Sequence, residues 1–385
     1  MSLAQYRNQT VYSILGVVFF VGGTYSSTSV AVESFTRDSY RDTRMLGRGN
    51  AGVADVGGGI SAFYNPAGLA SDDTFSFIPV DGAFGGNQNI YTSLDEIMGL
   101  TSSSQTLSAR FAPLLGKPMG LQGTFFPHVA IPGFMFGFYD YFDTNLEYKN
   151  PVFPQLDILM RNDWGLVFGG GVKVLPNVKV GVALRYLRRK TINESLSMAS
   201  VGNLNSSYLA TLYKRGEAVA LNAGVILDQP LNSKMSMSYG LSVEDIGFTT
   251  FRNSNRGPLP LRQAQRVHAG VAYKLATGGS ALKVLFDLKD LNNTEMDYSK
   301  KVYTGFELGI PAAVIRGGLF QGYWTAGLTI TAIPLFDLDI TTYGEELAYA
   351  AGLSQARYWM LGIRMGLDLT GKQKKKKQRF TLDHL

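Results

Sequence analysis

Few residues of this chain are of the types that carry out catalysis or bind metal ions. The sequence contains no cysteine and only three histidines, His128, His268 and His384. The lack of thiols excludes disulfide frameworks, zinc ribbons, iron–sulfur clusters and cysteine nucleophiles. The sequence also has no Gly-x-Ser-x-Gly turn, no Walker phosphate loop and no His-Glu-x-x-His motif. We therefore expect no catalytic residue, no metal site and no cofactor, and hence no enzyme.

Two glycine-rich motifs near the N-terminus are the strongest candidates for a functional segment. The first contains Arg44, Gly47, Gly49, Ala51, Gly52 and Ala54, and the second reads Tyr64-Asn65-Pro66-Ala67-Gly68-Leu69. The glycines permit close backbone packing or a positive φ angle. Asn65 can cap a helical turn that begins at Pro66, because proline at this position lacks only a donor that would be unpaired anyway. Such a segment is either a static structural element or a movable one.

The elements that must position these motifs are strands with two different faces. Val178, Val180, Val182 and Leu184 alternate with polar or small residues, and 236–243, 266–275 and 359–369 alternate in the same way. Alternation with a period of two predicts β-strands. These runs are about ten residues or longer, whereas strands of soluble domains average about 5–6 residues. Their length favours a transmembrane barrel with a lipid-facing apolar side over a soluble sandwich.

Fourteen segments of this kind can be recognised. They are 74–84, 119–128, 133–148, 157–175, 177–195, 215–228, 234–247, 263–276, 280–291, 298–310, 312–321, 323–332, 335–344 and 357–369. Short connections rich in proline or glycine alternate with longer ones, except at 322. Short periplasmic turns and long outer loops are typical of outer-membrane barrels. The sequence therefore predicts an all-β fold: a transmembrane antiparallel β-barrel of about 14 strands over 74–371.

The two ends of the chain differ from this body. Residues 1–31 have one charged residue, an apolar run over 11–23 and small residues before Ala31, which predicts a cleaved signal peptide. The C-terminal tail 372–385 carries six basic residues within 372–379. Between these ends, 32–371 contains 29 basic and 29 acidic residues, so the charge gives no argument for a nucleic-acid partner. We expect export to the outer membrane of a Gram-negative-type bacterium.

The two motifs together resemble the N-terminal plug, or hatch, of the FadL-like outer-membrane transport family. Its members carry an Arg-x-x-Gly-x-Gly-x-Ala-Gly-x-Ala stretch, a short spacer and then Tyr-Asn-Pro-Ala-Gly-Leu, which residues 41–70 match. The likeness extends to the barrel, since the long-chain fatty-acid transporters of this family have fourteen strands. The resemblance implies a plug over 32–73 and passive uptake of hydrophobic compounds such as long-chain fatty acids. The plug residues would be Arg44, Gly47, Gly49, Gly52, Tyr64, Asn65, Pro66 and Ala67.

Two expected outer loops carry apolar side chains that are candidates for ligand capture. Leu94, Ile97 and Met98 lie in the first loop, and Leu204, Tyr208 and Leu212 share one helical face in 200–213. Such side chains either pack on the barrel rim or form a groove for an apolar substrate. The resemblance implies capture at the third and fourth outer loops, which by order are 196–214 and 248–262.

Charged residues on the polar faces of the strands leave a second hypothesis open. They are Arg185, Arg266, Lys274, Lys283, Asp287, Lys289, Glu307, Arg316, Asp337, Asp339 and Arg364. These charges either pair across the lumen or line a polar conduit. An ion-paired lumen would favour a non-transporting scaffold or surface-complex subunit, whereas an apolar tunnel or a lateral gap in the wall would favour transport. The expected partners are membrane lipids and a fatty acid or other apolar ligand, and the sequence indicates no particular protein partner.

Overall fold

The computed structural model describes residues 38–71, 75–99, 109, 111–150, 152–197, 200, 206–253, 257–277, 279–348 and 350–369. All of them belong to one compact unit, Glu33–Leu385. The expected signal peptide 1–31, the tail 372–385 and Leu204 lie outside the described residues. Among the residues that are described, no helix is both long and apolar enough to cross a bilayer.

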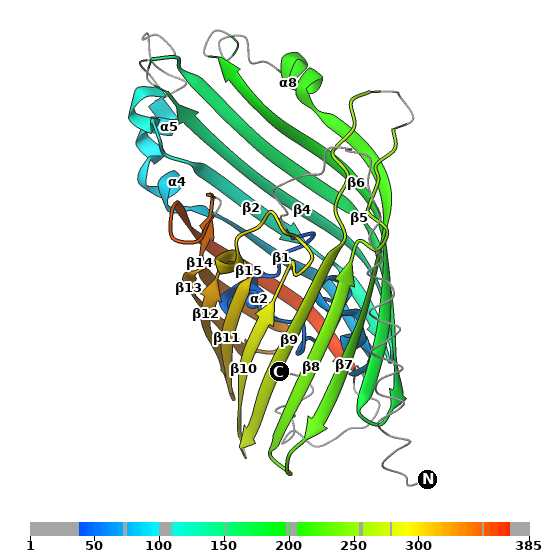
Figure 1. Cartoon of the computed structure of the whole chain (residues 1–385). Helices are drawn as coiled ribbons and strands as arrows, with labels where there is room; N and C mark the ends of the chain where they lie inside the picture. Colours follow the sequence, from blue (N-terminus) through cyan, green and yellow to red (C-terminus); the bar gives the residue numbers. More distant parts are fainter. Residues whose placement is uncertain are drawn as a thin grey trace. The chain divides into compact units, whose positions relative to one another are not determined.

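The described strands form one antiparallel sheet that closes on itself (Figure 1). They are β1 Phe75–Asn87, β2 Met119–Phe125, β3 His128–Ile131, β4 Phe134–Lys149, β5 Gln155–Leu175, β6 Val178–Ser197, β7 Lys214–Pro230, β8 Met235–Glu244, β9 Arg266–Thr277, β10 Ser280–Leu288, β11 Val302–Ile310, β12 Ala313–Phe320, β13 Tyr323–Ile333, β14 Phe336–Glu346 and β15 Gln355–Leu369. The last strand, β15, pairs with β1 and closes the barrel.

One strand position of the wall is interrupted. Both β2 and β3 pair with β1 on one side and with β4 on the other, so together they occupy a single place. The described barrel therefore has fourteen strand positions, which confirms the expected fold. The expected strand 119–128 is the one that breaks in two. The long segment expected at 157–175 is a single strand of 21 residues.

Short helical elements precede the barrel and occupy its longer connections. α2 (Thr43–Gly47), α3 (Ser61–Tyr64) and the 3-10 helix η1 (Pro66–Ser71) come before β1. Between β1 and β2 lie α4 (Gln88–Thr92), α5 (Leu94–Gly99) and η2 (Ala112–Leu114). Between β6 and β7 lies α8 (Ser206–Leu212), and η3 (Tyr298–Lys300) joins β10 to β11.

The strands differ in length around the barrel. Figure 1 shows β4–β7 continuing well beyond the end of the shorter strands on the side of the longer connections. β5 and β6 have 21 and 20 residues, whereas β10 and β11 have 9 each. Because outer-membrane barrels have short periplasmic turns and long outer loops, the extended ends of β4–β7 face the cell exterior.

The burial pattern of the wall is the inverse of that of a soluble protein. On β6, Val182 and Leu184 are 56% and 46% exposed, whereas the inward Arg185 is 1% exposed. The same inversion occurs on β10, where Val284 and Phe286 are exposed and Asp287 is buried. An apolar outer belt around a polar interior is the architecture of a bacterial outer-membrane barrel. The two-faced alternation expected from the sequence is thus confirmed.

This orientation predicts the effect of a charge on the outer belt. Val182→Arg should lower the free energy of unfolding in lipid vesicles by roughly 2–4 kcal/mol, because it places a guanidinium near the middle of the hydrocarbon layer. Chemical denaturation in vesicles measures the change, with Val182→Ile as the apolar control. Equal stability of the Arg and Ile variants would contradict the lipid-facing assignment.

Candidate functional site

Residues 38–71 lie against the inward face of the barrel, and almost all of their side chains are buried. Inward glycines of the wall make room for them. A Cβ atom on Gly181 of β6 would lie 2.2 Å from the carbonyl oxygen of Pro66, and one on Gly305 of β11 would lie 2.1 Å from that of Arg48. Since any side chain at these two positions would collide with backbone, glycine is what allows the close approach.

Asn65 has the role that the sequence suggested and an additional one. Its Oδ1 accepts a hydrogen bond from the backbone N–H of Ala67 at 3.1 Å, which caps the turn that begins at Pro66 and confirms the expected cap. Its Nδ2 donates to the carbonyl oxygen of Val53 at 2.7 Å, and more weakly to carbonyl oxygens of β7 and β8. Asn65 therefore joins the two motifs and ties both to the wall.

The glycines of the first motif are also in contact with the wall. Gly47 meets Gly327 of β13 with almost no space between the backbones, and Gly49 has a φ angle of +71°. The backbone N–H groups of Gly52 and Val53 both donate to Oδ2 of Asp287, at 2.6 and 2.9 Å. One inward carboxylate of β10 thus anchors the middle of the segment.

Arg44 and Tyr64 complete the set of candidate plug residues. Arg44 forms ion pairs with Asp42 at 2.6 Å and with Asp81 of β1 at 3.1 Å. Tyr64 donates from its hydroxyl to Oδ1 of Asn50 at 2.5 Å. The structure therefore brings Arg44, Gly47, Gly49, Gly52, Tyr64, Asn65, Pro66 and Ala67 together in one buried segment. That this segment closes a passage remains a prediction.

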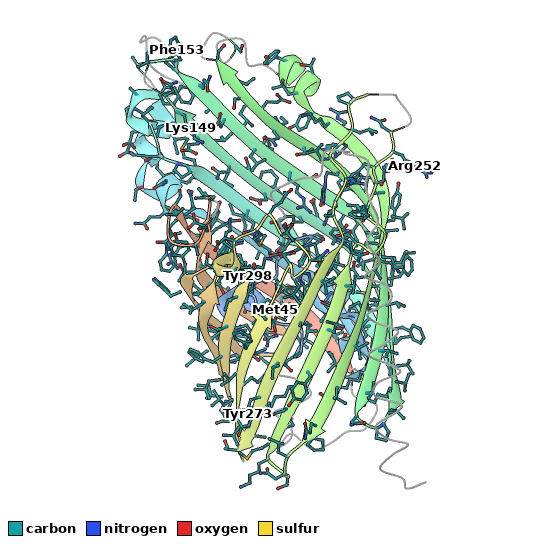
Figure 2. All side chains as sticks on the ribbon, viewed as in Figure 1. Met45, Lys149, Phe153, Arg252, Tyr273 and Tyr298 are labelled. Carbon is teal, nitrogen blue, oxygen red and sulfur yellow. The ribbon has the colours of Figure 1, made fainter. Side chains whose placement is uncertain are left out.

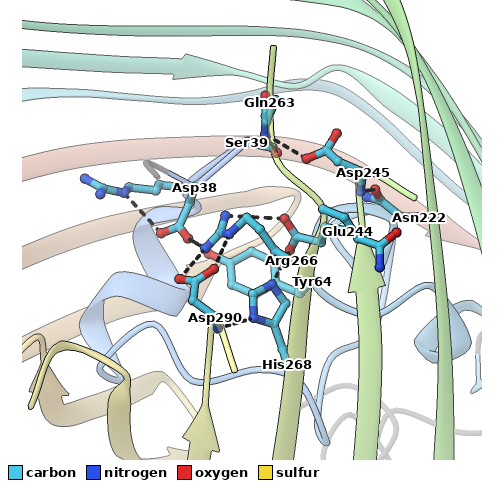
Figure 3. Close-up of polar contacts among 12 residues, drawn as sticks. Asp38, Ser39, Tyr64, Asn222, Glu244, Asp245, Gln263, Arg266, His268 and Asp290 are labelled. Carbon is cyan, nitrogen blue, oxygen red and sulfur yellow. Dashed lines mark hydrogen bonds and ion pairs between the residues drawn. The ribbon is translucent and has the colours of Figure 1, made fainter. Parts of the chain in front are cut away.

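Several inward charges of β8–β14 pair with charges of the segment, and others pair within the wall, such as Arg316 with Glu307 at 2.7 Å. Asp55 lies 2.7 Å from Lys274, 2.9 Å from Lys283 and 3.3 Å from Arg48. Figure 3 shows a second cluster, in which Arg266 lies between Asp38, Glu244 and Asp290. In the same cluster, Nδ1 of His268 accepts a hydrogen bond from the backbone N–H of Asp290 at 3.0 Å.

These ion pairs control the protonation of the segment's carboxylates. Burial alone would raise the pKa of Asp55, but Lys274, Lys283 and Arg48 hold that pKa well below its usual range. Burial opposes ionisation of Asp38 in the same way, and Lys289, Arg266 and Arg41 lower its pKa despite this. Both carboxylates are therefore charged at neutral pH and attach the segment to the wall electrostatically.

A different environment faces the segment on the side of β2–β6. Phe63 stacks on Tyr40 with ring centroids 4.5 Å apart and meets Phe126 and Tyr139 edge-on at 5.2 Å each. Phe126 and Tyr139 are both fully buried. Ala183, Val167 and Leu187 of the wall extend this contact into an apolar cluster. Here the segment meets the wall mainly through aromatic and aliphatic side chains, and we call this the apolar side of the lumen. Buried ion pairs within the wall border it, because Asp163 pairs with Arg161 and Arg189, and Arg185 pairs with Asp245.

The apolar side coincides with the interruption of the wall. Phe126 and Pro127 separate β2 from β3, and residues 79–81 of β1, including Pro79, lie opposite. Neither proline has an N–H group to donate. The backbone N–H of Phe126 donates to Asp81 at 2.7 Å, and that of Phe138 donates to Pro127 at 3.1 Å. The wall is bridged here, but it lacks the regular ladder of its neighbours.

The described candidate capture residues lie on two different helices, α5 and α8. Tyr208 and Leu212 of α8 are partly buried against Tyr148, Leu156, Ile158, Ile192 and Leu196, on the extended ends of β4–β6. Leu94 is 47% exposed on α5, outside this cluster, and Ile97 is partly exposed. Met98 is in α5, but its side chain lies outside the described part of the chain. The structure therefore gives Tyr208 and Leu212 the role of covering the outer strand ends.

Sequence reasoning missed the charged residues of the segment that pair with the wall. Asp38, Arg41, Arg48 and Asp55 lie in or next to the first motif, and Arg41 reaches Glu345 across 304 positions at 3.0 Å. The sequence did contain a signal, because these charged residues lie among or beside the glycines of a motif that was expected to be buried. The break between β2 and β3 also had a signal in the sequence, because Pro127 cannot donate a backbone hydrogen bond. Within the described residues, no group of three or more histidine, aspartate or glutamate side chains could hold a metal ion.

Comparison with known proteins gives a likeness in solved structures only. No family model and no curated protein matches the chain. The toluene transporter TodX of Pseudomonas putida is 8% identical, with a TM-score of 0.48, and the match covers 88% of this chain and 99% of TodX. The toluene transporter TbuX of Ralstonia pickettii (9%, TM-score 0.45) and the monoaromatic hydrocarbon channel CymD (10%, TM-score 0.45) each match over 85% of this chain and 97% of their own. Scores this low assign neither a family nor a function.

The fit between segment and wall can be tested with one methyl group. Gly181→Ala should displace the turn at Pro66, because the new Cβ would lie 2.2 Å from a carbonyl oxygen. The chain has no cysteine, so Ser61→Cys, at a fully buried position, provides a unique reporter. We expect a maleimide to label this cysteine many times faster in the Gly181→Ala background.

The matched control is Gly170→Ala on β5. A Cβ there would lie 3.4 Å from a ring atom of Phe134, an ordinary contact. Labelling should remain slow in this background. If both alanine variants label at the same rate, the segment does not depend on the wall glycines for its position.

The ion pairs of Asp55 predict how the segment responds to acid. Since the pKa of Asp55 is lowered in the folded state, the stabilisation is complete above the unfolded-state pKa of about 3.9 and is lost as the pH falls through the lower folded value. Conductance in planar bilayers should therefore stay constant down to about pH 4 and rise only in stronger acid. Asp55→Asn should raise the conductance at every pH, because it leaves buried cations without their partner. A rise between pH 6 and pH 5 in wild type would assign the response to another group.

Proposed function

We propose that this barrel is a passive outer-membrane transporter for hydrophobic compounds, with residues 38–71 as its plug. The observation that carries the proposal is the apolar side of the lumen, where Tyr40 and Phe63 of the segment face Phe126 and Tyr139 of the wall. An apolar solute can replace these aromatic contacts at little cost. The same solute on the side of β8–β14 would have to separate the buried charges that join the segment to the wall, which costs several kcal/mol for each charge left unpaired.

The interruption at Phe126–Pro127 supports the same proposal. It adjoins the apolar cluster, and it is a place where the wall has lost regular hydrogen bonding. A solute that enters from the outer loops would displace the segment locally and leave beside the interruption. We propose an elongated apolar molecule such as a long-chain fatty acid, or a compact aromatic hydrocarbon, as the transported ligand. The resemblance of residues 41–70 favours the first, and the aromatic lining suits both.

A second candidate function is a non-transporting scaffold on the same fold. The ion pairs between the segment and β8–β14 favour it, because a lumen held by buried charges resists opening. A scaffold would not need to bind or pass a ligand on the apolar side of the lumen. The two candidates therefore differ in what should happen when that side alone is altered.

The test is uptake of a labelled long-chain fatty acid and of a labelled aromatic hydrocarbon by liposomes that contain the purified barrel. We expect wild type to take up at least one of them faster than empty vesicles. No uptake of either above the empty-vesicle rate would reject the transporter and leave the scaffold.

Two alanine substitutions, each removing one buried aromatic ring, test which side of the lumen the transported compound follows. Phe126→Ala opens space on the apolar side and should raise the uptake rate several-fold. Phe320→Ala removes an equally buried ring from the other side, where Phe320 packs between Tyr303 and Tyr343, and should change uptake little. Each deletion should cost about 3–5 kcal/mol of stability, so denaturation curves verify that the two variants are matched. Equal uptake by both variants would show that the route does not follow the apolar side.

A further inference from the structure

A group of cations lies on the outer face of the barrel, where the apolar belt ends. Going outward along β6, the exposed side chains are Leu184, Tyr186, Arg188 and Lys190. On β7 the corresponding order is Val219, Glu217 and Arg215. Tyr186 pairs with Val219, Arg188 with Glu217 and Lys190 with Arg215, so the change from apolar to charged residues occurs at one level on both strands.

Arg252 adds a further charge from the connection between β8 and β9. It lies opposite Glu217 in an isolated antiparallel bridge, and the two backbones exchange hydrogen bonds of 2.8 Å. Its side chain is exposed, and Figure 2 shows it on the outside of the strands. Four cations therefore surround one carboxylate on this part of the wall.

The carboxylate of Glu217 already has two partners. Oε1 of Glu217 accepts from Arg188 at 2.9 Å, and Oε2 accepts from the Tyr186 hydroxyl at 2.7 Å. In the described part of the chain, no carboxylate lies within ion-pair distance of Lys190, Arg215 or Arg252. Lys190 and Arg215 are moreover direct cross-strand neighbours, and like charges in this arrangement destabilise a sheet. An external anion would remove that repulsion.

The surroundings indicate the kind of anion. Trp164 lies beside the group, with the Arg188 guanidinium 5.0 Å from its ring centre, and tryptophan is typical of the interface between lipid and water. Farther out, Ile192 and Leu196 are covered by α8. The cations thus form a single level between the hydrocarbon-facing belt and a covered surface. That is the depth of the lipid headgroups, on the side of the long outer loops.

We propose that Lys190, Arg215 and Arg252 bind the phosphate of an anionic lipid headgroup in the outward-facing leaflet. Guanidinium groups match phosphate oxygens with paired hydrogen bonds, and the lysine adds a point charge. Arg188 positions the site by holding Glu217 away from the three cations. The acyl chains of the lipid lie along Leu184, Val219 and Leu221, which are exposed directly below. The site is on the outer surface, so it is independent of any passage through the lumen.

The experiment compares two lipids that differ only in the phosphate. The purified full-length barrel is titrated in mild detergent with dioleoyl phosphatidic acid or with dioleoylglycerol, and bound lipid is measured by native mass spectrometry. Wild type should bind the phosphatidic acid at least about tenfold more tightly. Lys190→Gln with Arg215→Gln should remove most of that preference. Arg252→Gln, which lies outside the strands, should weaken binding about threefold or more with no risk to folding.

The matched control is Lys173→Gln with Lys234→Gln, which removes two exposed cations near the short-turn end of the barrel. This variant should bind phosphatidic acid as wild type does, and a heat-dependent gel shift verifies that every variant is folded. Equal binding of the two lipids by wild type, or equal losses in the test and control variants, would overturn the proposal. Displacement of the lipid by millimolar inorganic phosphate would also overturn it, because the site would then recognise a small anion and not a headgroup.

Discussion

Buried charge in the lumen is the constraint on which the rest of this structure depends. A barrel whose apolar side faces lipid must turn its polar side chains inward, where each unpaired charge is costly. The wall pairs some of these charges with each other, such as Arg316 with Glu307, and the segment before the first strand supplies further partners. Asp55 pairs with Lys274 and Lys283, Asp38 pairs with Arg266, and the backbone N–H groups of Gly52 and Val53 donate to Asp287. Wall glycines such as Gly181 and Gly305 provide the space for this contact.

The segment meets the two sides of the lumen differently, through ion pairs with charges of β8–β14 and through aromatic rings on the side of β2–β6. Aromatic rings there fill the space between the segment and β2–β6, next to the break at Phe126–Pro127. Strong ion pairs and weak, non-directional packing therefore hold the same segment on its two sides. A segment held in this way can yield on its apolar side while its charged side stays attached. This asymmetry is the physical basis of the transporter that we propose.

Much of the fold could be predicted from the sequence, since alternation with a period of two is visible in each strand. The cap by Asn65 was predictable for a similar reason, because it involves residues adjacent in the chain. The pairing of Asp55 with Lys274, or of Arg41 with Glu345, joins residues more than two hundred positions apart, and nothing local marks it. The break between β2 and β3 was missed because the alternating pattern resumes after Pro127. The packing of Tyr208 and Leu212 on β4–β6 could not be predicted, because the sequence defined the lengths of these strands only approximately.

The central claim is that passage of a hydrophobic compound requires the segment to move relative to the wall. Asn65 lies against Gly224 of β7, where a Cβ would be 2.8 Å from the carboxamide carbon, so cysteines at these two positions are close enough for a disulfide. The measurement is uptake of the labelled fatty acid or hydrocarbon by liposomes containing the Asn65→Cys/Gly224→Cys variant, oxidised and then reduced. We expect uptake to stop when the disulfide forms and to return on reduction. Equal uptake in both states, with the disulfide verified by mass, would contradict a moving segment.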